Sequence, residues 1–163
     1  MAVDMFLEID TINGETEDKV FKPKKAMDIL AWSWGLSNSG TTHTGGGGGS
    51  GKCNVQDISV TKYVDKASNA LLDGCAKGTH FTKATLTVRK AGAKPLEYII
   101  ITMTEVIVTS VSTGGSGGED RLTENVSLNF AEVKFEYQPQ DKTGAADGAK
   151  LPFTYNIAAN SSD

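Results

Sequence analysis

Apolar and polar side chains alternate along most of this chain, as in a strand with one buried and one solvated face. The alternating runs are Met5, Leu7 and Ile9; Leu30, Trp32, Trp34 and Leu36; Ile58 and Val60; Ala84, Leu86 and Val88; and Leu151, Phe153, Tyr155 and Ile157. We expect each run to form a strand. Because Trp32 and Trp34 share a parity with Leu30 and Leu36, we expect the tryptophans to be buried.

Two longer segments change parity partway along. In the segment from Arg121 to Gln138, the apolar positions move from even to odd numbers near Ala131. The segment from Leu96 to Ser112 shows a similar change near Glu105 and is too long for one plain strand. A β-bulge absorbs one extra residue and bends a strand. We therefore predict a bulge in each segment and expect the two strands to bend side by side.

Pro152 interrupts the last alternating run. Proline has no N–H to donate and is confined to edge strands or to the first residues of a strand. The sequence therefore predicts that residues 151–157 form a strand at an edge of the sheet, where another chain can add.

One helix is predicted, from Asp65 to about residue 77. Asp65 can cap its first turn, Ala67, Leu71 and Cys75 recur at four-residue spacing, and Gly78 can end it. A single short helix among many strands favours a mainly β fold, a sandwich or a barrel, over an alternating α/β sheet. The 163 residues fit one domain spanning 1–163.

Charge and hydropathy exclude two classes of partner. The net charge is −4, and no block of Lys or Arg offers a surface for phosphate backbones, so we expect no nucleic-acid partner. No apolar run approaches the roughly 20 residues that cross a bilayer, and residues 1–10 lack the start of a signal peptide. We expect no membrane insertion. We expect the protein to be made in the cytoplasm, and any export to use a route without a cleaved signal peptide.

The segment from Gly46 to Lys52 matches the first seven positions of a phosphate-binding P-loop. That motif needs a strand before it, a Ser or Thr after the lysine and a helix that follows. Here the preceding residues are polar, the next residue is Cys53, and residues 55–64 alternate like a strand. We therefore expect no nucleotide or other cofactor.

The residue types that most often carry catalysis are not grouped along the chain. His43 and His80 lack a Cys, Asp or Glu at metal-like or triad-like spacing, and Cys53 and Cys75 are not at metal-ligand spacing. Asp57 and Glu105 are candidates for an acid–base pair, but nothing in the sequence brings them together. We expect no catalytic and no metal-binding residues, and hence no enzyme.

One set of segments is spread along the chain: residues 31–35, 45–52, 55–57, 61–66, 88–92 and 105–140, the last of which includes the run from Ser112 to Asn125. These segments resemble the Hcp family, the tube proteins of bacterial type VI secretion systems. They cover nearly the whole chain in order. Cys53 departs from the family, in which a small aliphatic residue is expected.

The resemblance implies two sheets that close into a barrel with one helix against it, similar to phage tail tubes. It further implies that six copies form a ring and that rings stack into a tube in the cytoplasm. A contractile sheath is then expected to propel the tube outward, into the extracellular space or a target cell. The implied partners are further copies of the chain, sheath and spike or tip proteins, and effector proteins carried in the lumen.

Three groups of residues are candidates for assembly roles. By resemblance, the Gly-rich loop of residues 38–51 reaches the adjoining ring. We name as its stacking loop Thr44, Gly45, Gly46, Gly47, Gly48, Gly49, Ser50, Gly51 and Lys52. The second Gly-rich turn is expected on a ring face and comprises Gly114, Gly115, Ser116, Gly117, Gly118, Glu119 and Asp120. The polar row of Thr123, Asn125, Ser127 and Asn129 suits a water-filled bore or an ordinary solvated face.

An alternative function belongs to a different class. A monomeric β-sandwich could bind a sugar or another small ligand, with Trp32 and Trp34 as stacking groups. This alternative requires exposed tryptophans, whereas their parity predicts burial. A third reading, a hydrolase that uses Asp57 or His80, would require turnover that we do not expect.

Overall fold

The computed structural model describes residues 3–40 and 51–162. The elements in chain order are β1 (Val3–Ile9), β2 (Met27–Ser33), β3 (Leu36–Asn38), β4 (Cys53–Val55), β5 (Ile58–Tyr63), α1 (Ser68–Lys77), β6 (His80–Lys90), β7 (Leu96–Thr113), β8 (Thr123–Tyr137) and β9 (Leu151–Asn156). The fold is mainly β with one short helix, as the sequence predicts.

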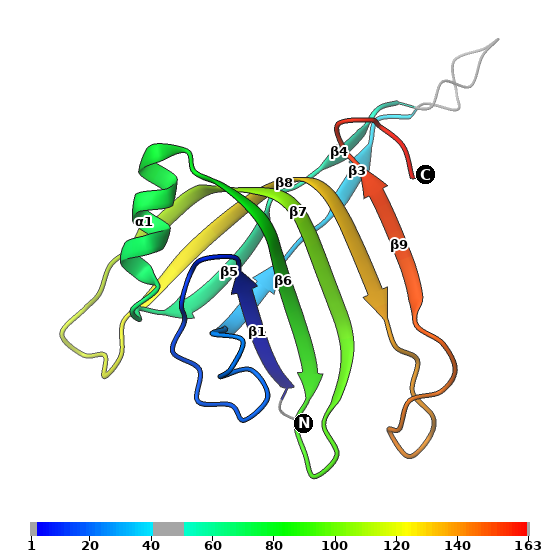
Figure 1. Cartoon of the computed structure of the whole chain (residues 1–163), viewed down its shortest axis with the longest axis horizontal. Coiled ribbons are helices and arrows are strands. Elements are labelled where there is room, and N and C mark those ends of the chain that lie inside the picture. The colour runs from blue at the N-terminus through cyan, green and yellow to red at the C-terminus, as the bar shows by residue number, and fades with distance from the viewer. Residues whose placement is uncertain (1–2, 41–50, 163) are drawn as a thin grey trace.

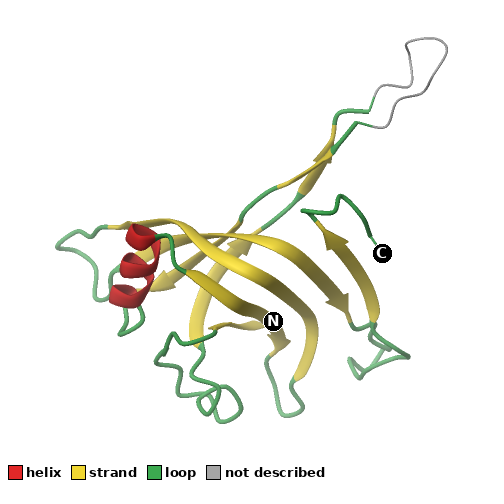
Figure 2. Ribbon diagram, turned by 45° about the horizontal axis from the view of Figure 1, so that its top comes forward, coloured by secondary structure: helices red, strands yellow, loops and turns green. Residues whose placement is uncertain are grey.

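The main sheet closes on itself. Its strand order is β5-β2-β1-β6-β7-β8-β9, and β5 also pairs with β8. The first six of these strands therefore form a closed barrel, while β9 continues the sheet beyond it (Figure 1). A separate two-stranded ribbon, β3 and β4, projects from the barrel at the end away from α1 in both views (Figures 1 and 2). The predicted barrel is confirmed.

The barrel closes because two strands share one edge of β8. The first part of β8 pairs with β5, from Thr123 to Leu128, and the last part pairs with β9, from Glu132 to Tyr137. The pairing with β5 thus stops at Leu128, and the pairing with β9 starts at Glu132. One long strand thus belongs both to the barrel and to the sheet that extends from it.

The predicted changes of parity are confirmed. In β8, Phe130 and Val133 are both buried, so the buried face changes at Ala131. In β7, Met103 and Val106 are both buried, so the face changes at Glu105, which has a left-handed φ of 55°.

The predicted bulges at these two residues are wrong. Thr104 lies opposite Glu132 and Val106 opposite Phe130, so the register between β7 and β8 is the same on both sides of the change. Both strands bend together, side by side as predicted. The register shifts further along β7, between Val108 and Ser110.

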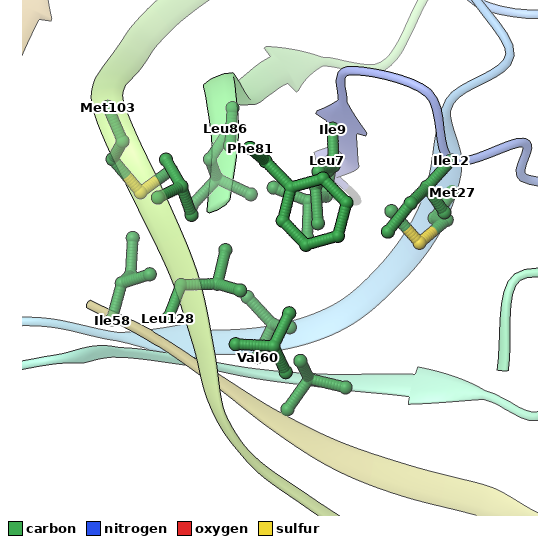
Figure 3. Close-up of a cluster of buried hydrophobic side chains, with 14 of the residues drawn as sticks. Leu7, Ile9, Ile12, Met27, Ile58, Val60, Phe81, Leu86, Met103 and Leu128 are labelled. Atoms are coloured by element: carbon green, nitrogen blue, oxygen red, sulfur yellow. The ribbon is translucent and has the colours of Figure 1, made fainter. Parts of the chain in front are cut away.

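Apolar side chains from all six barrel strands fill the interior (Figure 3). Their largest fully buried members include Leu7, Met27, Ile58, Leu86, Met103 and Leu128. Burying each such side chain stabilises the fold by roughly 1.5–3 kcal/mol. Leu71 of α1 joins this core, and Phe81 of β6 lies against Gly74, where an added Cβ would meet the ring at 3.0 Å.

A second apolar cluster lies outside the barrel. Phe6 of β1 stacks on Phe21 at 4.1 Å between ring centroids, and Ala26 completes the cluster. Arg89 of β6 binds Asp18 at 2.5 Å and Asp4 at 3.0 Å. The segment between β1 and β2 is therefore fastened to the outer face of β1 and β6.

The helix begins later than predicted. It starts at Ser68, with Ala67 at the N-cap, and ends at Gly78 in a left-handed conformation. Asp65 accepts a hydrogen bond from the Ala67 N–H at 2.9 Å, so its carboxylate serves the turn before the helix and not the first helical turn. Ala67 and Leu71 are buried, as their spacing predicts.

The prediction for the run from Leu30 to Leu36 is wrong in part. Leu30 and Leu36 are 40% and 41% exposed, because the register of β2 shifts between Ile29 and Ala31 and Ile29 takes the buried position. Trp32 and Trp34 are half-buried against the main core. The chain also leaves the barrel at Trp34, and β3 forms a separate strand.

Candidate assembly surfaces

The polar row of Thr123, Asn125, Ser127 and Asn129 lies on the outer face of β8. Alternate residues of β8 between them, such as Val126 and Leu128, are buried in the barrel. Thr123, Asn125 and Asn129 are exposed and Ser127 is half-buried. These four side chains therefore share one solvated face of the barrel.

This polar face continues across neighbouring strands. Ser33 of β2 lies opposite Ser59 of β5, Ser59 opposite Ser127 of β8, and Ser127 opposite Ser110 of β7. Residues directly opposite in adjacent strands point to the same side of a sheet. Four strands thus carry one serine row (Ser33, Ser59, Ser127 and Ser110), of which the sequence identified only Ser127, because the others depend on the register.

Hydrogen bonds tie this face together. Thr61 donates to the amide oxygen of Asn125 at 2.7 Å, and the Ser59 and Ser127 hydroxyls are 3.3 Å apart. Further along, Asn129 donates to one oxygen of Asp57 at 2.9 Å and Thr109 donates to the other at 2.7 Å. The Asp57 carboxylate, a candidate acid or base from the sequence, is thus held by amide and hydroxyl donors.

A buried ionic cluster lies directly beneath the polar face. The ammonium of Lys62 contacts Glu124 at 2.6 Å and Asp65 at 2.9 Å, and Ser68 donates to Glu124 at 2.7 Å. The cluster joins β5, β8 and the start of α1. Sequence reasoning missed it, although Lys62 shares a parity with Ile58 and Val60, and Glu124 with Val126 and Leu128.

The edge strand β9 has an open side. The Ile157 N–H donates to Ala131 of β8 at 2.8 Å, while the Asn156 N–H donates in the other direction, to Ser161 at 2.8 Å. Because main-chain groups alternate sides along a strand, Thr154 and Pro152 face away from β8. Pro152 therefore interrupts no hydrogen bond between β8 and β9, and the predicted edge strand is confirmed.

Two apolar side chains of β9 are exposed to solvent. Leu151 is 59% exposed and Phe153 38% exposed. Among the described residues, no strand pairs with β9 on the side away from β8. An edge with free main-chain groups and exposed apolar neighbours is suited to pairing with another chain.

A second open edge lies where β1 and β2 diverge. These strands share only two paired positions, Phe6 with Asp28 and Leu7 with Met27. From Leu30 to Ser33, β2 pairs with β5 on one side and, within the described chain, with no strand on the other.

Only the base of the predicted stacking loop falls within the described residues. Thr44 to Ser50 lie outside them. Gly51 accepts a hydrogen bond from the Asn38 side chain at 2.8 Å, and Lys52 is exposed immediately before β4. The ribbon therefore carries the two ends of this loop away from the barrel.

The predicted ring-face turn, residues 114–120, joins β7 to β8 and is exposed throughout. It lies beside α1, at the end of the molecule away from the ribbon (Figures 1 and 2). Nearby, the Arg121 guanidinium stacks 3.8 Å from the centre of the Tyr63 ring. The turn and the ribbon thus mark two different ends of the subunit.

The histidine and the cysteines of the described residues lie on three different elements, β6, β4 and α1. His80 is exposed at the start of β6, and Cys53 and Cys75 are half-buried free thiols. In residues 3–40 and 51–162, no group of His, Cys, Asp and Glu side chains is placed to hold a metal ion. Over the same ranges, no helix is long and apolar enough to span a membrane.

Known proteins resemble the chain over nearly its whole length. The family model described as "Type VI secretion system effector, Hcp" matches residues 6–137. Protein hcp1 of Pseudomonas aeruginosa is 56% identical over 161 residues, which are 98% of each chain. A solved "type six secretion system protein" superposes with a TM-score of 0.90 at 31% identity, covering 98% of this chain and 99% of that one. The crystal structure of Hcp1 from Salmonella typhimurium superposes with a TM-score of 0.78 at 34% identity, covering 99% of each chain.

Proposed function

The chain belongs to the Hcp family of type VI secretion proteins, and from this membership we propose that it is the structural subunit of a secretion tube. In this proposal its copies close into hexameric rings, and the rings stack into a tube that a contractile sheath propels outward. Effector proteins travel in the lumen. The subunit itself performs no catalysis, and it leaves the cell through the type VI secretion system.

The observation that carries this proposal is the pair of unlike open edges. A ring of identical subunits needs two different surfaces that fit each other. The free main-chain groups of β9 at Thr154 and Pro152 provide one surface, and the open edge of β2 from Leu30 to Ser33 provides the other. Pairing them would continue the sheet from one subunit to the next and would cover Leu30 and Leu151, which are exposed in the isolated subunit.

The polar face supports the proposed lumen. The serine row runs across β2, β5, β8 and β7 and so begins on the strand that has the open edge. A surface of hydroxyl and amide groups binds water well and holds passing proteins weakly, which suits transport. The polar row of Thr123, Asn125, Ser127 and Asn129 is the part of this lining that β8 contributes.

The two ends of the subunit support stacking. The ribbon extends from one end and the turn of residues 114–120 lies at the other (Figure 1). We assign the stacking loop, Thr44 to Lys52, to contact with the adjoining ring, on which the turn of residues 114–120 is exposed. Rings with two unlike faces stack head to tail and build an open-ended tube.

Removing the glycine run tests the division of roles. A variant that lacks Gly45–Gly49 should still form rings in electron micrographs but should fail to stack them into tubes under conditions in which the parent chain stacks. Collapse of this variant to monomers would contradict the assignment and would place the loop at the contact between neighbouring subunits.

The ligand-binding alternative has no comparable support. Trp32 and Trp34 pack against the main core and are half-buried. The ring centroid of Trp34 lies 6.4 Å from that of Phe130 and 6.3 Å from that of Phe135. Its indole N–H donates a hydrogen bond to the main-chain oxygen of Gln56. These tryptophans therefore do not form an open stacking platform.

A further inference from the structure

Within the ribbon strands, residues 36–38 and 53–55, Val55 at the base is the residue that packs against the main core. β3 and β4 share three paired positions, from Leu36 with Val55 to Asn38 with Cys53. All three residues of β3 are exposed. An isolated two-stranded ribbon is marginally stable in water. The direction in which the ribbon leaves the barrel must therefore be set at its base.

Trp34 occupies that base. It lies between the end of β2 at Ser33 and the start of β3 at Leu36. Its indole N–H donates to the main-chain oxygen of Gln56 at 3.0 Å, and the Gln56 N–H donates to Gly35 at 3.0 Å. These two hydrogen bonds tie together the two chain segments that connect the ribbon to the barrel.

The same indole ring is packed against the barrel. It stacks on Phe135 with an angle of 18° between the ring planes and meets Phe130 at 54°. The two phenylalanines lie on either side of Ala131, where β8 changes face. Because Phe135 is directly opposite Phe153 of β9, Trp34 also holds the ribbon relative to the open edge proposed to close the ring.

We propose that Trp34 is a positioning residue for ring stacking: its stack on Phe135 and its hydrogen bond to Gln56 fix the direction of the ribbon. This inference deepens the proposed function and rests on it for the consequence in stacking, whereas the effect on the ribbon is a property of the single subunit. Trp32 supplies the matched control, since it is also half-buried against the core but lies within β2.

Amide hydrogen exchange measures the ribbon directly. Losing both the ring stack and the hydrogen bond in Trp34→Ala should speed exchange in residues 36–38 and 53–55 by about tenfold or more, with β6 unchanged. Trp34→Phe keeps a ring but loses the donor, so its increase should be smaller, a few-fold. Trp32→Ala and Trp32→Phe should leave the ribbon close to the parent chain.

Electron microscopy of the Trp34 variants tests the consequence. Trp34→Ala should form rings that stack poorly, and Trp34→Phe should recover part of the stacking. If ribbon exchange in the Trp34 variants is no faster than in the Trp32 variants, the proposal is overturned. Normal stacking by Trp34→Ala would overturn it as well. A parent chain that forms no rings would instead refute the proposed function, and the exchange comparison would still decide the role of Trp34 in the subunit.

Discussion

The ammonium nitrogen of Lys62 lies 2.6 Å from Oε1 of Glu124, and the two side chains are 0% and 1% exposed. They face each other directly across β5 and β8, the strands that close the barrel. The ammonium also donates to Asp65 and to the main-chain oxygen of Tyr63, each at 2.9 Å. All three of its donors are therefore used.

Removing one partner of this buried pair should destabilise the protein strongly. Lys62→Met leaves the Glu124 carboxylate buried without its counter-ion, at a cost of about 3–5 kcal/mol in the free energy of unfolding. Urea denaturation measures the difference. The double variant Lys62→Met with Glu124→Leu should recover part of the loss, because it removes the unpaired charge.

Lys77 provides the matched control for this prediction. It pairs with Asp73 on the surface, where the two side chains are 69% and 58% exposed, so Lys77→Met should change stability little. If Lys62→Met cost no more than Lys77→Met, the buried pair would have no role in closing the barrel.

The contact between Asp18 and Arg89 should make stability depend on pH. The Arg89 guanidinium, by hydrogen bonding to the carboxylate, holds the pKa of Asp18 below its ordinary value of 3.8. A depressed folded-state pKa adds stability above the ordinary value, and this stability is lost as the pH falls through the lower folded value. At neutral pH the parent chain should therefore have a larger free energy of unfolding than Asp18→Asn. This difference in stability should become smaller below pH 3.8.

Urea denaturation of both proteins at neutral pH and near pH 3 checks this expectation. Asp73→Asn, at the exposed pair with Lys77, controls for the general effect of acid on the protein. If the difference in the free energy of unfolding between the parent chain and Asp18→Asn stayed constant or became larger in acid, the account would be contradicted.

The free edge of β9 should be required for ring closure. Thr154→Pro removes an N–H that faces away from β8, so it should leave the β8–β9 pairing intact and prevent the next subunit from adding. We expect folded monomers, seen as an unchanged far-UV circular dichroism spectrum with a lower mass in solution. Thr154→Val keeps the N–H and should still form rings.

A charge near this edge offers a second route to the same result. Leu151 is 59% exposed, so Leu151→Glu should leave the isolated subunit folded. The same variant should weaken ring closure, because it places a charge beside the edge at which the next subunit would add. Intact rings in both Thr154→Pro and Leu151→Glu would show that β9 is not the edge at which subunits join.

The sequence predicted those features that depend on neighbouring residues. Alternation along the chain located the strands, the parity changes at Glu105 and Ala131, and the edge position of Pro152, because each is a local property of one strand. Leu30 was predicted wrongly, since the irregularity between Ile29 and Ala31 that turns it outward leaves no mark in the apolar pattern.

Features that depend on strand register could not be predicted. The closure of β5 on β8 pairs residues 60 or more positions apart, such as Lys62 with Glu124. The serine row is likewise visible only when Ser33, Ser59 and Ser110 are brought alongside Ser127. Lysine is seldom buried unless paired, so Lys62 would have been assigned to solvent without knowledge of its partner.

The mass of the purified chain in solution, together with electron micrographs of the same sample, tests most directly whether identical subunits close a ring through unlike edges. The account predicts a homohexamer of the 17.2 kDa chain and ring-shaped particles with an open centre. A monodisperse monomer at every concentration, with no ring particles in the micrographs, would contradict it.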